Sequence, residues 1–141
     1  MEIKAEKHSN IERIMAAAGI IAAAIGSFVV AYFNPVTAGF FPQCPLFQLF
    51  GINCPGCGLT RGFHALFHGD ILTALHYNAL LPLYAFILGY ILVSVFLIAV
   101  RGRGLSWKVF TPNALYALLI LMLVFAVLRN IPVYPLNLFA P

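Results

Sequence analysis

The sequence predicts an all-α integral membrane protein with three transmembrane helices and an interfacial or re-entrant helical hairpin between the first and the second. Apolar and aromatic residues make up 62% of the 141 residues, whereas only 9% are charged. Soluble domains carry about 25% charged residues, and a core of this size cannot hide so much apolar surface from water. Three uncharged apolar runs of about 20 residues are each long enough to cross the hydrocarbon core as a helix.

The first predicted span covers residues 14–33 and follows a tail of residues 1–13. Arg13 precedes this uncharged run and Asn34-Pro35 ends it, because the residue before a proline is biased away from helix. A cleaved signal peptide is the alternative, but the run is longer than the usual signal core, so an uncleaved anchor is expected. Small residues spaced four apart give the helix a smooth face suited to close packing, including packing in a homo-oligomer.

Two further spans are predicted at residues 79–100 and 109–128, joined by a loop of residues 101–108. The basic residues of this loop and of the N-terminal tail lie on one side of a three-span protein, which the positive-inside rule places in the cytoplasm. Residues 34–78 and the tail of residues 129–141 then face outward. We expect a protein of the cell membrane with a cytoplasmic N-terminus and an extracytoplasmic C-terminus. The absence of a basic patch with interleaved aromatics argues against nucleic-acid binding.

The outward segment is too apolar for a free loop and predicts a helical hairpin at the outer interface. Its first helix is expected over residues 57–68 and its second over residues 71–77, with Gly69 ending the first and Asp70 capping the second. Leucine and phenylalanine recur at helical spacing on one side of the first helix. The other side carries four residues within roughly 60° of one another. These four are Cys57, Arg61, His64 and His68.

Three cysteines carry the distinctive chemistry of the chain: Cys44, Cys54 and Cys57. Cys54-Pro-Gly-Cys57 at a helix N-terminus fits a redox pair, because backbone N–H groups and the helix dipole stabilise a thiolate there, and Arg61 one turn later would add to this effect. An extracytoplasmic position favours a disulfide, either within the pair or from one member to Cys44. A purely structural disulfide that ties the hairpin to the preceding loop is an alternative to redox chemistry.

The same motif also fits a zinc site, since a C-P-x-C-G turn lets two thiolates reach one ion. A complete site needs two further ligands, which Cys44 and either His64 or His68 would supply, because histidines four apart on a helix can share a metal. The alternative for both histidines is an interfacial side chain with an apolar body and a wet tip. The structural, redox and metal interpretations of the cysteines therefore all stay open.

Three charged residues near the outer edge of the membrane are further candidates: Arg61, Asp70 and Arg129. Ionisable groups at such depth are costly unless they are paired, which makes them functional candidates. Asp70 is the only acid after residue 12, so it is the expected partner of Arg61 or Arg129. For Arg129, a snorkelling side chain at the end of the third span is the alternative.

These motifs resemble a family of small bacterial multi-pass membrane proteins known as domain of unknown function 2752. The resemblance is carried by Cys44-Pro45, the run from Cys54 to Arg61, Gly69-Asp70, Asn78 and Arg129-Asn130. It implies family membership and topology, but no reaction. It favours seven residues as functional: Cys44, Cys54, Cys57, Thr60, Arg61, Gly69 and Asp70. Relatives usually have Asn-Pro where this chain has Asn78-Ala79, so this chain lacks the proline that would favour a kink or turn there.

The leading functional hypothesis is a non-enzymatic membrane module, because the chain contains no complete catalytic constellation. Its cysteine hairpin, locked by a disulfide or a metal such as zinc, would present Arg61 and Asp70 to a partner membrane protein or to a lipid headgroup. One alternative is a thiol-disulfide oxidoreductase that uses Cys54 and Cys57, with Cys44 as a relay, and exchanges electrons with a membrane quinone. Another is a subunit of an oligomeric transporter, since a polar hairpin that dips into the bilayer can line a path.

Overall fold

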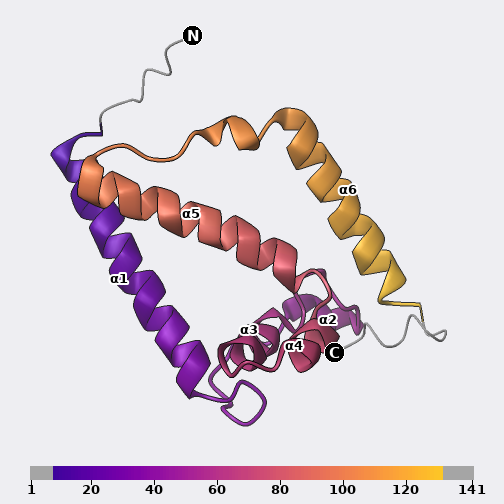
Figure 1. Cartoon of the computed structure of the whole chain (residues 1–141). Coiled ribbons are helices and arrows are strands. Elements are labelled where there is room, and N and C mark those ends of the chain that lie inside the picture. The colour runs from indigo at the N-terminus through magenta and orange to yellow at the C-terminus, as the bar shows by residue number, and fades with distance from the viewer. Residues whose placement is uncertain (1–7, 132–141) are drawn as a thin grey trace. The chain divides into compact units, whose positions relative to one another are not determined.

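The computed structural model describes residues 8–131, and all regular structure within that range is helical (Figure 1). The all-α class is therefore confirmed. The chain divides into two compact units. One comprises the residues up to Phe28 together with Leu83–Thr111, and the other comprises Val29–Pro82 together with the residues from Pro112 onward.

The first helix, α1 (Asn10–Tyr32), begins four residues earlier than the predicted span. The reason is a capping box at its N-terminus. The backbone N–H of Ser9 donates to Glu12 Oε2 over 2.7 Å, and the backbone N–H of Glu12 donates to Ser9 Oγ over 3.3 Å. Because these two bonds satisfy donors that a helix start leaves open, the helix extends outward through charged residues that a membrane core would exclude.

The N-terminal turn of α1 is tied to the C-terminal end of α5 (Leu81–Arg101) within the first unit. Arg13 donates from Nε to the carbonyl of Ala99 over 3.3 Å and from Nη2 to the carbonyl of Val100 over 3.2 Å. A cation is favoured here because the last carbonyls of a helix have no helical partner and carry the negative end of its dipole. Gly102 ends α5 in the left-handed region, with φ of +68°.

Two helices, α1 and α5, are long and apolar enough to cross a membrane. Within their most apolar stretches 0% and 6% of the residues are buried inside the chain, unlike the core helix of a soluble protein. Such helices indicate a membrane protein. The third apolar helix, α6 (Pro112–Leu128), has 17 residues, fewer than the about 20 of a typical spanning helix, so a third span is not confirmed. It starts later than expected because residues 107–109 form a short 3₁₀ turn, η1 (Trp107–Val109), and Pro112 takes the first helical position.

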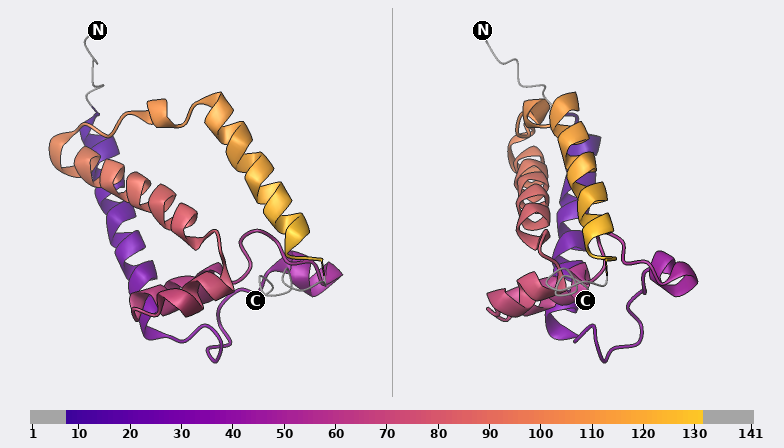
Figure 2. Two further views of the ribbon diagram at one scale, coloured as in Figure 1. Left: turned by 45° about the vertical axis from the view of Figure 1, so that its right-hand side comes forward. Right: turned by 90° about the vertical axis from the view of Figure 1, so that its right-hand side faces the viewer.

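The second unit contains a hairpin of two short helices, α3 (Leu59–Phe67) and α4 (Ile71–Tyr77), preceded by α2 (Pro45–Phe50). The two helices of the hairpin pack side by side, as Figures 1 and 2 show from three directions. A small core of Ala65, Ala74 and Leu81 lies between them and the start of α5. Gly62 permits this approach, because a Cβ there would lie 3.2 Å from the carbonyl oxygen of Ala74 and from Cδ1 of Leu81.

Candidate functional site

The Cys54–Cys57 loop closes before α3 begins, so Cys57 lies outside the helix. The backbone N–H of Cys57 donates to the carbonyl of Cys54 over 3.1 Å and forms a tight turn. Gly58 follows with φ of +80°, a left-handed conformation that glycine adopts without steric penalty, and serves as the N-terminal cap of α3. The first helix of the hairpin therefore starts two residues later than expected, and the prediction that Cys57 shares a helical face with Arg61 is wrong.

The structure brings the three cysteines together from two segments of the second unit. Cys54 Sγ lies 3.3 Å from Cys44 Sγ and 3.3 Å from Cys57 Sγ. All three sulfur atoms lie within 4.8 Å of one another. All three are free thiols in this structure, with Cys57 buried and the other two half-buried. The arrangement gives three sulfur donors around a single point.

The two outer thiols of this cluster differ in acidity. The backbone N–H of Phe47 donates to the sulfur of Cys44 and lowers the pKa of that thiol to about 7. Burial disfavours the thiolate of Cys57, and hydrogen bonding with Cys54 adds to this, so that the pKa of Cys57 rises to about 12. Cys44 is therefore the reactive end of the cluster, and Cys57 keeps its proton unless a cation takes its place.

The backbone of the cysteine loop is held by a buried side chain from the end of α4. Asn78 is fully buried and donates from Nδ2 to the carbonyl of Pro55 over 2.8 Å and to the carbonyl of Cys57 over 3.2 Å. Its Oδ1 accepts from the N–H of Leu80 over 2.9 Å. The N–H of Leu81 donates to the carbonyl of Asn78 over 2.9 Å. A turn between α4 and α5 is thus present although Ala79 stands where relatives usually have proline.

Two residues that follow α6 hold the same loop from the other side. Arg129 is 1% exposed and donates from Nη1 to the carbonyls of Cys54 and Cys57, over 3.1 and 2.9 Å. Asn130 donates from Nδ2 to the carbonyl of Asn53 over 2.8 Å, and the N–H of Asn53 donates back to Asn130 Oδ1 over 2.8 Å. We call Asn78, Arg129 and Asn130 the carbonyl clamp. Sequence reasoning assigned no role to its two asparagines, although both stand directly beside apolar helices.

These contacts exclude one alternative and correct one expectation about the charged residues. Arg129 does not snorkel, because it is 1% exposed and donates to backbone carbonyls, including that of Tyr77 over 3.4 Å. Asp70 caps α4 as expected, and its Oδ1 accepts from the N–H of Thr73 over 3.0 Å. Within residues 8–131, however, the structure records no ion pair between Asp70 and Arg61 or Arg129, so the expected pairing is wrong.

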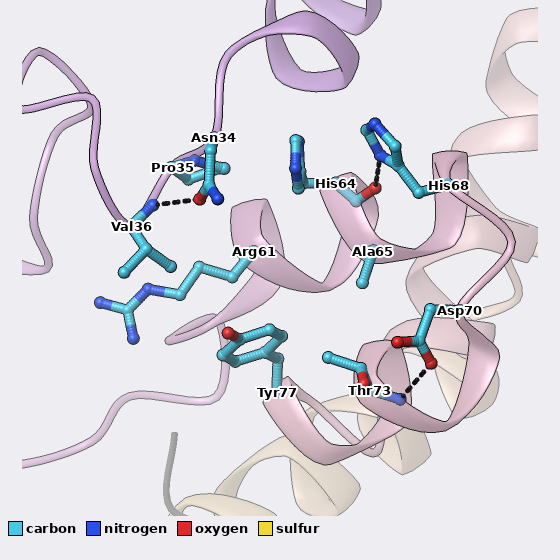
Figure 3. Close-up of a pocket in the computed structure, with 10 residues that line it drawn as sticks. All are labelled: Asn34, Pro35, Val36, Arg61, His64, Ala65, His68, Asp70, Thr73 and Tyr77. Atoms are coloured by element: carbon cyan, nitrogen blue, oxygen red, sulfur yellow. Dashed lines mark hydrogen bonds between the residues drawn. The ribbon is translucent and has the colours of Figure 1, made fainter.

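The predicted histidine ligands lie in a pocket of about 230 Å³ rather than with the thiols (Figure 3). His64 Nδ1 lies 2.8 Å from the carbonyl oxygen of Val30, and His68 Nδ1 lies 2.8 Å from the carbonyl oxygen of His64. Because a carbonyl oxygen only accepts, Nδ1 carries the hydrogen in both rings and Nε2 is the remaining nitrogen. The group of sulfur atoms includes neither histidine.

A larger cavity of about 650 Å³ has all three cysteines in its wall, together with Thr60 and Arg61. Arg61, which is exposed, lines both this cavity and the smaller pocket. The thiol cluster therefore borders a cavity, and Thr60 and Arg61, which the family resemblance favours, line the same cavity without belonging to the group of sulfur atoms.

Together these features define an all-helical protein with two candidate membrane-spanning helices and a cluster of three cysteines beside a helical hairpin. Residues 44–92 match the model of the family described as protein of unknown function DUF2752. The resemblance drawn from the cysteine motif is thereby confirmed. Comparison with curated proteins and with solved structures found no significant match.

Proposed function

We propose that this is a multi-pass protein of the cell membrane in which the DUF2752 segment forms a non-enzymatic module at the outer face. In this arrangement α1, α5 and α6 all cross the bilayer, with the N-terminus cytoplasmic and the C-terminus extracytoplasmic. Arg101 at the end of α5, together with Arg103 and Lys108 between α5 and α6, supports that orientation. The 17 residues of α6 reach the lower end of the range for a spanning helix.

We propose further that the three cysteines bind one metal ion, for which zinc is the best fit. This ion would join the segment of Cys44 to the Cys54–Cys57 loop. The observation that carries this proposal is the group of three sulfur atoms within 4.8 Å. Thiolates on one tetrahedral zinc, with bonds of about 2.3 Å, lie about 3.8 Å apart, so small side-chain shifts from the observed separations suffice. The carbonyl clamp fixes the backbone of the loop, which means that a disulfide is not needed to give it shape.

A site with three protein ligands leaves a fourth position to water or to a small ligand. His64 and His68 were the expected source of the fourth ligand, but both lie in the separate pocket and outside the group of sulfur atoms. The cavity of about 650 Å³ beside the thiols gives a water molecule access to that position.

Elemental analysis of the detergent-purified protein tests the metal proposal. We expect about one zinc per chain, lost on Cys44→Ser and on Cys54→Ser but retained in His64→Ala, which serves as the matched control. Metal-free wild-type protein whose mass shows the loss of two hydrogens would contradict the proposal and indicate a disulfide. Loss of zinc in His64→Ala would instead show that the histidine completes the site.

A second candidate function, thiol-disulfide exchange with a membrane quinone as electron acceptor, is favoured by one specific observation. Cys54 lies 3.3 Å from both other sulfur atoms, so it can pair with either, while the pKa of Cys44 near 7 provides a nucleophile. Redox titration separates the two functions. A reduction potential below about −300 mV would indicate an inert structural bridge, and a higher one would favour exchange.

The non-enzymatic module is expected to engage a partner membrane protein or a lipid headgroup through Arg61. This side chain is exposed, and no hydrogen bond or ion pair of its guanidinium is recorded among residues 8–131. Arg61→Ala should weaken association in a pull-down or lipid-binding assay and leave the melting temperature unchanged. Unchanged association would count against this role.

A further inference from the structure

The pocket between α3 and α4 carries opposite charges at its two ends (Figure 3). Arg61 and Asp70 lie on opposite sides of it in the close-up, with Tyr77 and Thr73 between them. The hydrogen bonds that Asp70 accepts from Thr73 hold the pKa of its carboxyl below the usual value, so the group is ionised at neutral pH. The two charges do not neutralise each other, since no ion pair between them is recorded among the described residues.

The lining between the two charges is polar on several sides. Tyr77 and Thr73 carry hydroxyl groups, and His64 lines the pocket with its Nδ1 hydrogen already committed to the carbonyl of Val30. Its Nε2 atom is then the nitrogen open to a ligand. The pocket of about 230 Å³ lies just below the roughly 300–1,000 Å³ of sites for drug-sized ligands, which suits a ligand the size of a headgroup.

We propose that this pocket binds a zwitterion that carries a phosphate and a primary ammonium group, the chemistry of a phosphoethanolamine headgroup. Arg61 takes the phosphate, because a guanidinium matches phosphate oxygens with paired hydrogen bonds. Asp70 takes the ammonium, whose N–H groups donate to the carboxylate oxygen. The lipid source of this headgroup rests on the proposed function, which places the pocket at the outer membrane interface. The charge arrangement itself does not depend on the metal or on the topology.

The pocket discriminates between headgroups by the chemical group that each presents to Asp70. A glycerol headgroup has the phosphate but no ammonium, so it leaves the charge of Asp70 without a cationic partner. A choline headgroup has a quaternary ammonium without N–H donors, which is bound best by a cage of aromatic rings. Tyr77 is the one aromatic side chain among the ten residues that line the pocket apart from the two histidines, so no such cage is present. We therefore expect ethanolamine lipids to bind more tightly than glycerol or choline lipids.

Native mass spectrometry of the full-length protein in detergent measures this preference directly. The probes are dioleoyl phosphatidylethanolamine, phosphatidylglycerol and phosphatidylcholine at equal concentrations, and free O-phosphoethanolamine in a separate arm. We expect Arg61→Gln to weaken binding of all phosphate probes and Asp70→Asn to reduce the preference for the ethanolamine lipid by roughly fivefold. Asparagine retains the capping of α4, so Asp70→Asn removes the charge and leaves the helix start intact. Arg103→Gln, an exposed arginine outside the pocket, is the matched control.

Equal retention of the three lipids by the wild-type protein, or an unchanged preference in Asp70→Asn, would overturn the proposal. Saturable binding of free O-phosphoethanolamine that competes with the lipid supports the site and assigns the headgroup as the recognised part. Binding of the free compound without any lipid binding supports the zwitterion site but assigns it to a soluble ligand. Zinc content, measured on the same samples, reports separately on the cysteine centre, so the two proposals fail independently.

Discussion

Replacing Asn78 with alanine removes three hydrogen bonds of a fully buried side chain. The carbonyl of Pro55 and the N–H of Leu80 each lose a part-buried hydrogen bond to Asn78, whereas the carbonyl of Cys57 keeps its bond from Arg129. A net contribution of about 1 kcal/mol per bond gives a cost of about 3 kcal/mol for opening the cysteine loop. Since each 1.4 kcal/mol is a factor of ten, the population of the open loop should rise about 100-fold.

The reporter for this opening is Cys57, which is only 8% exposed in the closed loop. In metal-free protein its alkylation rate, measured by peptide mass spectrometry, follows the open population when closing is faster than modification. Cys57 should therefore be alkylated about 100-fold faster in Asn78→Ala than in the wild type. The alkylation rate of Cys57 should be higher still in Asn78→Asp, because this variant loses both N–H groups of the amide and places a carboxylate beside carbonyl oxygens. Asn113→Ala, an exposed asparagine of α6, is the control. Rates in Asn78→Ala within a few-fold of that control would refute the reasoning.

Three further predictions follow from the same unit of the chain. Arg129→Lys should destabilise the fold by roughly 2–3 kcal/mol, because a single ammonium cannot reproduce the guanidinium's three bonds to carbonyls, and an unchanged melting temperature would contradict this. In metal-free protein, alkylation of Cys44 should rise about tenfold per pH unit and level off above its pKa of about 7. Alkylation of Cys57, with a pKa of about 12, should be much slower but should still rise about tenfold per pH unit where Cys44 has levelled off; the reverse order would be inconsistent with the structure. Gly62→Val should lower stability by roughly 1–3 kcal/mol in thermal unfolding, because its side chain meets α4 and Leu81. The control Gly19→Val, at a position with nothing within 4 Å, should stay close to the wild type.

Local properties of the chain were predictable from the sequence. The apolar helices follow from the length and composition of uncharged runs, because the transfer of a helix into lipid depends on its own residues. The predicted ends of two helices were wrong. The capping box of Ser9 and Glu12 starts α1 within charged residues, and Pro112 sets the start of α6. Gly69 and Asp70 were expected at the turn of the hairpin and lie there.

The site was predictable only in part, because its members are far apart in the chain. The motif identified Cys54 and Cys57, but two cysteines ten residues apart do not reveal that Cys44 Sγ lies 3.3 Å from Cys54 Sγ. The role of Arg129 depends on a contact across 72 residues, and charge alone favoured the wrong partner, Asp70. Charge balance alone would pair Arg129 with an acidic residue. In the folded chain its guanidinium instead donates hydrogen bonds to carbonyl groups of the cysteine turn.

The amino-acid sequence was enough to predict a helical chain, three apolar helices of which two are long enough for a membrane, and a cysteine motif that carries the chemistry. Each of these depends on neighbouring residues, through hydrophobicity, capping and spacing. The folded chain was needed to show that, among the alternatives for the cysteines, the one that brings all three sulfur atoms together holds, that Asn78, Arg129 and Asn130 hold the loop, and that Arg61 and Asp70 line one pocket. These contacts join residues that are far apart in the chain, so each forms only when a long loop closes. Preferences between pairs of residue types do not determine which distant groups then come into contact.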